Sequence, residues 1–165
     1  MDLRLTPMTA QDWPQVRAIY EEGIATRQAT FQTDAPSWDE WDAAHLPCCR
    51  WVARSDEGVL GWAALSPVSR RSCYSGVAEF SVYVRAASRG QGVGTALLAR
   101  LIADSEAQGI WTLQGVTFPE NTASLRLQAR CGFRVVGRRE RIARIGGVWQ
   151  DTVLTERRSQ AVGTD

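Results

Sequence analysis

A glycine-rich segment, residues 89–95 (Arg-Gly-Gln-Gly-Val-Gly-Thr), separates an apolar stretch from a run with helical periodicity. A turn of this kind between a strand and a helix leaves backbone N–H groups bare, and the helix dipole adds positive potential at the same place. Glycines also let a phosphate approach the main chain, because no side chain intervenes. The segment therefore predicts a binding site for a phosphate-bearing anion.

The spacing of the glycines distinguishes this loop from two other phosphate-binding loops. A P-loop requires a lysine, and all 19 basic residues of this chain are arginines. A dinucleotide-binding fingerprint requires G-x-G-x-x-G, but Thr95 stands at the position of the third glycine. The absence of lysine also excludes enzymes that form a lysine Schiff base.

Glu79 is a carboxylate within an apolar stretch, residues 77–84, that alternates as a strand does. An amine attacks a carbonyl carbon only when it is neutral, and an α-amino group with a pKa of about 7.7 to 8.0 is mostly protonated at pH 7. A nearby carboxylate can remove that proton, directly or through a water, so Glu79 is the candidate general base. The alternative is a structural glutamate paired with an arginine such as Arg71.

Two further candidates lie in the polar stretch before that strand. The guanidinium of Arg71, with Arg70 beside it, could hold a carboxylate or phosphinate group of a substrate through two parallel hydrogen bonds. Tyr74 would form a wall of the same pocket. The alternative is that these are solvated loop residues, since loops are ordinarily polar.

Other chemistries find little support in the residue types. His45 is the single histidine and has no nucleophile-elbow motif around it, which disfavours a Ser-His-Asp arrangement. The four cysteines, including the neighbours Cys48 and Cys49, lack C-x-x-C spacing, so we expect no metal site and free thiols. No charged-then-apolar leader and no apolar run of about 20 residues is found, and we expect a cytoplasmic protein without a membrane partner.

The elements that must position these residues follow from periodicity and turn signals. With 165 residues, 44% of them hydrophobic, we expect a single domain over residues 1–157 and a flexible tail over residues 158–165. Thr9 and Asp12 mark a helix start, and Asn121 marks another. The expected strands are residues 3–5, 51–54, 59–65, 77–84, 111–116, 133–145 and 148–154, and helices are expected after Thr9 and over residues 93–109 and 121–131.

The phosphate loop and a later stretch together resemble the GNAT acetyltransferase superfamily. Arg89-x-x-Gly92-x-Gly94 is similar to its acyl-coenzyme A pyrophosphate loop, and Asn121-x-x-Ser124 followed by Cys131-Gly132-Phe133 is similar to its second conserved stretch. Over nearly the whole chain the sequence resembles the phosphinothricin and methionine sulfoximine N-acetyltransferase branch. The matching features are Thr30-Phe31, Trp41, Trp51-Val52-Ala53, Gly61, Arg71-x-x-Tyr74, Glu79-x-Ser81-Val82-Tyr83-Val84 and Trp149-x-Asp151.

This resemblance implies a fold and an activity. The fold would be an α/β (α+β) GNAT fold, a mixed and mostly antiparallel twisted sheet of about seven strands, flanked by helices and splayed between its fourth and fifth strands. The co-substrate would be acetyl-CoA, without a metal. The protein would be a homodimer that acetylates the amine of a small amino-acid-like molecule, such as phosphinothricin, methionine sulfoximine or methionine sulfone, by direct attack in a ternary complex.

The resemblance also implies roles for individual residues, with Glu79 as the catalytic base. Substrate contacts fall to Phe31, Arg71 and Tyr74, and cofactor contacts to Val82, Tyr83, Val84, Arg89, Gly90, Gln91, Gly92, Val93, Gly94, Thr95, Asn121 and Ser124. One position departs from the family. Gln128 stands where many members have a Tyr, and the nearest branch a His, as the acid for the leaving thiolate, and a glutamine has no titratable proton to give.

Two alternative functions remain open at the level of sequence. The same fold and cofactor could serve to acetylate a protein N-terminus or a polyamine. A non-catalytic module that binds acyl-CoA or RNA is the second alternative, because five arginines lie in residues 134–144. A net charge of +1 and the lack of interleaved aromatic residues for base stacking argue against a nucleic-acid partner.

Overall fold

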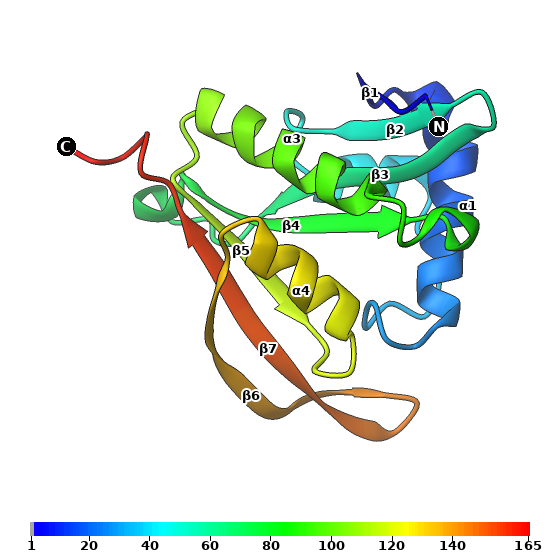
Figure 1. The fold of residues 1–165 in the computed structure, drawn as a ribbon. Helices are drawn as coiled ribbons and strands as arrows, with labels where there is room; N and C mark the ends of the chain where they lie inside the picture. The colour runs from blue at the N-terminus through cyan, green and yellow to red at the C-terminus, as the bar shows by residue number, and fades with distance from the viewer. Residues whose placement is uncertain (1) are drawn as a thin grey trace.

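The computed structural model describes residues 2–165, which form one seven-stranded sheet in the order β1-β2-β3-β4-β5-β7-β6 (Figure 1). Neighbouring strands pair antiparallel, except for β4 and β5, which are parallel. This confirms the predicted mixed, mostly antiparallel sheet. The strands are β1 (Arg4–Pro7), β2 (Trp51–Ser55), β3 (Gly58–Pro67), β4 (Val77–Val84), β5 (Thr112–Thr117), β6 (Arg134–Ile145) and β7 (Val148–Arg158).

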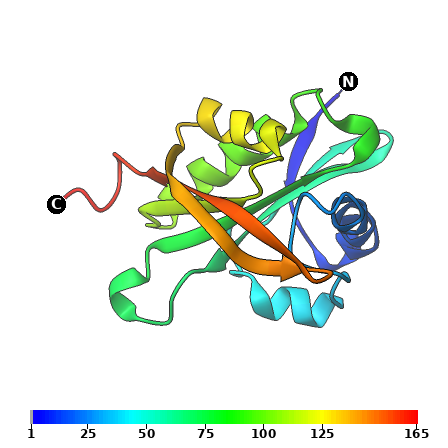
Figure 2. The same cartoon turned by 90° about the horizontal axis from the view of Figure 1, so that it is seen from below.

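Helices cover both faces of the sheet (Figure 2). On one face lie α1 (Trp13–Ala25) and α2 (Trp38–Ala44), and on the other lie α3 (Val93–Ala107) and α4 (Thr122–Arg130). Short 3₁₀ turns are η1 (Ala10–Asp12), η2 (Ser72–Tyr74) and η3 (Ala86–Ser88). The helix start predicted at Thr9 is the η1 turn, where the Asp12 carboxylate accepts a hydrogen bond of 2.8 Å from the Thr9 N–H.

The two faces hold separate hydrophobic cores, which β3 connects. Because side chains alternate along a strand, Trp62 of β3 packs with the core of α1 and α2, while Leu65 packs with the core of α3. Both side chains are almost fully buried. The central strands are thereby fixed from both sides, and the connections at their ends can carry the site.

The β4 and β5 strands separate after a short stretch of pairing. Their register runs from Val77↔Thr112 to Glu79↔Gln114 and stops there, although both strands continue. The Arg85 N–H donates to the Leu60 carbonyl of β3 at 2.8 Å. In an antiparallel ladder the neighbouring amides alternate in direction, so the N–H groups of Val82 and Val84 face the gap. The predicted splay between the fourth and fifth strands is confirmed.

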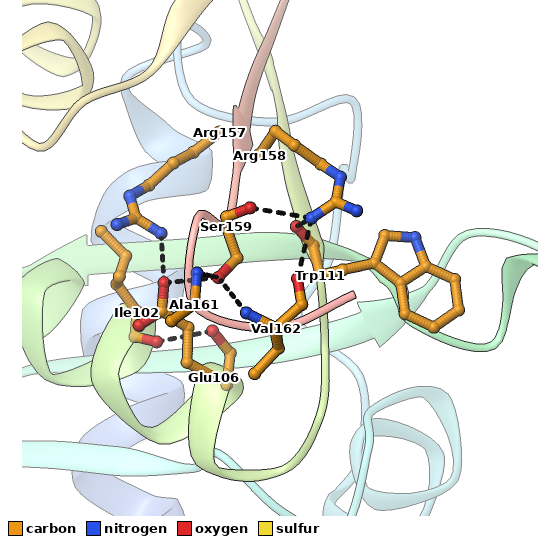
Figure 3. Close-up of polar contacts among 9 residues, drawn as sticks. Ile102, Glu106, Trp111, Arg157, Arg158, Ser159, Ala161 and Val162 are labelled. Atoms are coloured by element: carbon orange, nitrogen blue, oxygen red, sulfur yellow. Dashed lines mark hydrogen bonds and ion pairs between the residues drawn. The ribbon is translucent and has the colours of Figure 1, made fainter. Parts of the chain in front are cut away.

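The end of the chain packs against α3 and the start of β5 (Figure 3). Glu106 of α3 accepts hydrogen bonds from Arg157 (2.9 Å) and from the buried Ser159 (2.8 Å). The Arg158 guanidinium donates to the carbonyl oxygens of Ser159 (2.8 Å) and Val162 (3.0 Å). The expected tail thus begins inside β7, and its first residues are held by polar contacts that hydrophobic periodicity does not reveal.

In the described part of the chain, none of the helices has the length and apolar character that crossing a bilayer requires.

Candidate active site

A cavity of about 220 Å³ opens where β4 and β5 separate. Its walls are β4, the end of β5, the loop after α1 and the start of α4. Six of the predicted site residues line it, namely Phe31, Glu79, Val82, Tyr83, Asn121 and Ser124. The remaining lining residues are Ala29, Thr30, Gln32, Phe80, Ser81, Val116, Thr117 and Phe118.

Glu79 lies at the last paired position of β4 and β5, half-buried at the floor of the splay. The Gln114 side-chain amide of β5 donates a hydrogen bond of 2.9 Å to Glu79 Oε1. Among residues 2–165, no arginine forms an ion pair with this carboxylate, so the structural pairing with Arg71 considered above is not found. Glu79 Oε2 is therefore available to accept a proton from a molecule in the cavity.

The loop between α1 and α2 closes one side of the cavity. Its Phe31 ring packs edge-on against Phe118 after β5, at 4.8 Å between ring centroids. Asn121 side-chain N–H donates to the Gln28 carbonyl at 3.3 Å, which ties the loop to the start of α4. These contacts place an aromatic residue, predicted to touch substrate, opposite the β4 edge.

Tyr83 contributes a protonated phenol to the site. Burial raises its pKa above the usual range, and the Tyr20 hydroxyl nearby raises it further. The two rings meet edge-on at 5.0 Å between centroids. Tyr83 therefore stays neutral across the physiological range and acts by packing and hydrogen bonding rather than by ionising.

The glycine loop follows β4 and the short η3 turn, and it ends in the N-terminus of α3. Gly90 (φ +73°) and Gly92 (φ +84°) adopt left-handed backbone conformations, and a Cβ built on either one would meet nothing within 4 Å. The first amides of α3, from Val93 to Thr95, have no carbonyl of a preceding turn to bind. The loop is thus a cradle of open N–H groups, and its shape and donors fit a diphosphate.

The loop and the cavity are joined by the open edge of β4. Arg89 Nε donates to the Val84 carbonyl at 3.3 Å, which places this arginine between the loop and the strand. The free amides of Val84 and Val82 then lead from the loop to Glu79. A long ligand with a diphosphate at one end and amides along its arm fits this path, which is the composition of coenzyme A.

Two predicted substrate residues lie outside the cavity lining. Arg71 and Tyr74 belong to the β3–β4 connection, where the guanidinium lies over the ring at 5.8 Å, and both residues are exposed. Within one subunit the structure does not bring them to Glu79. The predicted role rested on the chemistry of a guanidinium and on the family resemblance, whereas the connection that carries both residues projects beyond the ends of β3 and β4 (Figure 2).

Three residues in or directly after β5 belong to the site but were not predicted from the sequence. Gln114 holds Glu79, while Thr117 and Phe118 line the cavity. No motif marks them, and their position depends on the parallel register of β4 and β5, which involves residues distant in sequence. The alternation of polar Gln114 with buried Leu113 in a predicted strand was the one available signal.

The single histidine takes no part in the site. His45 Nδ1 lies 2.7 Å from the Trp41 carbonyl, and its ring stacks on Trp41 at 4.0 Å between centroids. Burial lowers the pKa of His45, which therefore stays neutral. In residues 2–165 no group of three or more His, Cys, Asp or Glu side chains is arranged to hold a metal ion.

Comparison with known proteins gives consistent matches. A model of the acetyltransferase (GNAT) family matches residues 13–133. A phosphinothricin N-acetyltransferase of Alcaligenes faecalis is 38% identical over 155 residues, covering 88% of this chain and 77% of that protein. An L-methionine sulfoximine/L-methionine sulfone acetyltransferase of Pseudomonas paraeruginosa is 31% identical over 151 residues, covering 88% of each.

Solved structures extend the likeness to three dimensions. The crystal structure of a GNAT superfamily phosphinothricin acetyltransferase from Sinorhizobium meliloti, in complex with acetyl-CoA, aligns with a TM-score of 0.85 at 26% identity. The alignment covers 100% of this chain and 97% of that one.

Proposed function

The chain belongs to the acetyltransferase (GNAT) family, and from this premise we propose that it acetylates the amine of a small amino-acid-like molecule. The acetyl donor is acetyl-CoA, and the acceptor is of the phosphinothricin, methionine sulfoximine or methionine sulfone type. The similarity to acetyltransferases named for these acceptors supports the substrate class. The observation that carries the chemistry is a carboxylate, Glu79, at the inner end of an open strand edge that starts at the glycine loop.

The coenzyme's diphosphate is held by the amides of the glycine loop, with Arg89 beside it. The cradle comprises Gly90, Gln91, Gly92, Val93, Gly94 and Thr95. The open amides of Val82 and Val84 bind the pantetheine arm, and Asn121 and Ser124 flank it from α4. Arg85 is less available for phosphate, because it pairs with Glu57 at 2.7 Å.

Acetyl-CoA supplies a thioester, whose carbonyl carbon accepts the amine directly in a ternary complex. Glu79 removes a proton from the acceptor ammonium, directly or through a water, and so produces the neutral nucleophile. A main-chain N–H at the splay, such as that of Val82, stabilises negative charge on the carbonyl oxygen. Phe31 confines the acceptor against the β4 edge.

The charge pattern of the last hairpin does not favour an RNA-binding function. Arg134 pairs with Glu156 at 2.9 Å, and Arg138 pairs with Asp151 at 2.7 Å. The Arg144 guanidinium lies over the Trp149 ring at 4.2 Å. Two of the five arginines of residues 134–144 are thus paired with carboxylates of the hairpin, which leaves less unpaired positive charge to meet phosphates.

A thiol-release assay across a panel of acceptors tests the proposal. The panel contains phosphinothricin, methionine sulfoximine, methionine sulfone, common amino acids, a peptide with a free N-terminus and a polyamine. We expect turnover with the first three and little with the last two. Turnover restricted to the peptide or the polyamine would show that the acceptor belongs to a different class from the one proposed. Absence of both turnover and acetyl-CoA binding would contradict the proposed acetyltransferase activity.

We further propose that residues 1–157 act as one catalytic domain, and that the protein works as a cytoplasmic homodimer. The support for a dimer is the β6–β7 hairpin, which keeps large apolar side chains exposed, including Val135, Val148 and Trp149.

A further inference from the structure

Gln128 of α4 occupies a buried polar position directly behind the cavity. Its side chain is 1% exposed, so each of its polar atoms requires a partner. Gln128 Nε2 donates to Thr117 Oγ1 at 2.8 Å and to Ser124 Oγ at 3.0 Å. Gln128 Oε1 accepts from Thr155 Oγ1 at 2.5 Å. The amide is fully satisfied and links β5, α4 and β7.

This network fixes the direction in which two hydroxyl groups donate. An amide nitrogen has two hydrogens, and Gln128 gives one to Thr117 and one to Ser124. Each hydroxyl oxygen therefore serves as an acceptor toward Gln128, and its own hydrogen points elsewhere. Both residues line the cavity, but Thr117 is buried whereas Ser124 is partly exposed to it. Ser124 thus presents an O–H donor to a molecule in the cavity.

We propose that Ser124, oriented by Gln128, donates a hydrogen bond to the sulfur that leaves acetyl-CoA; this rests on the proposed function. Glu79 first passes the ammonium proton to solvent; the carbon–nitrogen bond then forms as the second proton on nitrogen passes to Glu79, and the carbon–sulfur bond breaks with its electron pair going to sulfur. The thiolate leaves with the Ser124 hydrogen bond in place and takes a proton from water, and the proton that Glu79 releases neutralises the hydroxide that remains. Ser124 donates a hydrogen bond and keeps its proton, and Gln128 is a positioning residue.

The physical basis is the strength of a hydrogen bond to an anion. Charge-assisted hydrogen bonds are about twice as strong as neutral ones. A free thiol such as that of cysteine has a pKa of about 8.5, so a thiolate is a reasonable leaving group near neutral pH once it is stabilised. The site therefore needs no titratable acid, which accounts for a glutamine at this position.

Binding of the product coenzyme A should therefore depend on pH. Since the Ser124 donor favours the thiolate over the thiol, bound coenzyme A should ionise at lower pH than free coenzyme A. Its affinity should then rise by roughly tenfold between pH 7 and pH 9. Acetyl-CoA has no thiol, and so it reports any contribution from Glu79 and Tyr83, the titratable side chains that line the cavity.

Titration calorimetry of the full chain with coenzyme A and with acetyl-CoA at both pH values provides the test. In Ser124→Ala we expect the pH-dependent gain for coenzyme A to disappear, any change in acetyl-CoA affinity to be the same at both pH values, and kcat to fall roughly tenfold. Thr117→Val removes the other hydroxyl bound by the same amide and should keep the gain. In Gln128→Glu the carboxylate accepts a hydrogen bond from the Ser124 hydroxyl instead of donating one, so this variant should lose the pH-dependent gain. Melting temperatures of the three variants check that each one is folded.

The outcomes distinguish the role of Ser124 from the proposed acetyltransferase activity. Binding of both ligands by the wild type with the same pH dependence would overturn the role of Ser124 while leaving the acetyltransferase activity in place. The same holds if Ser124→Ala retains the gain, or if Thr117→Val alone abolishes it. Failure of the wild type to bind either ligand would instead contradict the proposed function.

Discussion

Glu79 is held by a single neutral donor, and that environment suits a base. A carboxylate paired with an arginine is committed to its partner, whereas the Gln114 amide orients Glu79 through one oxygen and leaves the other open. Its unusual place in an apolar strand predicts Glu79 as the base from the sequence alone. Gln114 was not identified, because its position opposite Glu79 depends on a parallel pairing between strands far apart in the chain.

Replacing Glu79 by glutamine tests the base. Since a carboxamide keeps the shape but cannot take up a proton, we expect Glu79→Gln to lower kcat by about 10²- to 10⁴-fold while the affinity for acetyl-CoA is retained. Steady-state kinetics and calorimetry measure the two quantities. Glu140→Gln, on the exposed part of β6, is the control and should be neutral. Unchanged turnover of Glu79→Gln would remove Glu79 from the mechanism.

At the scale of elements, the strand–loop–helix unit of β4, residues 89–92 and α3 was predicted closely from sequence. The glycines, the helical periodicity after Val93 and the C-terminal Gly109 are local signals, and α3 indeed runs over Val93–Ala107. The cavity was predicted less completely. Its floor and walls combine β4, β5 and the loop after α1, and no local pattern specifies how those segments approach one another.

Two glycines at opposite ends of α3 allow a matched test of the loop. Gly92 (φ +84°) and Gly109 (φ +79°) both have left-handed backbones, and a Cβ on either would meet nothing within 4 Å. Replacing either glycine by alanine should therefore strain the backbone to a similar extent and lower the free energy of unfolding, measured in urea, by about 1–2 kcal/mol. Only Gly92→Ala should also weaken acetyl-CoA binding in calorimetry, by tenfold or more, because its methyl group occupies the diphosphate cradle. Equal affinity of the two variants for acetyl-CoA would show that the diphosphate does not bind at Gly92.

The contact between α3 and the chain end gives stability a dependence on pH. Hydrogen bonds from Arg157 and Ser159 hold the pKa of Glu106 below its usual value. A carboxylate with a lowered folded pKa stabilises the fold above its unfolded pKa of about 4.3, and this contribution is lost as the pH falls through the folded value. Glu106→Gln should therefore lower the melting temperature by a few degrees at pH 7 and by much less at pH 3.

The exposed pair of Arg17 and Glu21 on α1 supplies the comparison for that measurement. Both side chains are about half exposed, and such pairs contribute little. Glu21→Gln should shift the melting temperature only slightly at either pH. A difference between Glu106→Gln and wild type that persists undiminished at pH 3 would show that the carboxylate charge is not the cause.

For the whole molecule, the exposed apolar side chains of the β6–β7 hairpin predict a homodimer. Val135, Ile142, Val148 and Trp149 of the β6–β7 hairpin are each about half exposed or more. If a second copy covers this hairpin, light scattering should give a particle of twice the 18.2 kDa chain mass. Val148→Asp should shift it toward the monomer, while Val68→Asp, an exposed valine outside the hairpin, should not. A wild-type particle of one chain mass at all concentrations would contradict the dimer.

The separation of β4 from β5 gives the protein an edge strand in the middle of its own sheet. Without a ligand, the amides of Val82 and Val84 exchange their hydrogens with solvent as those of an outer strand do, and they are equally open to pairing with another chain. If a pantetheine arm binds there as proposed, it should complete the ladder and protect these amides. Binding of the acyl donor should thereby stabilise the folded protein as well as supply the reaction.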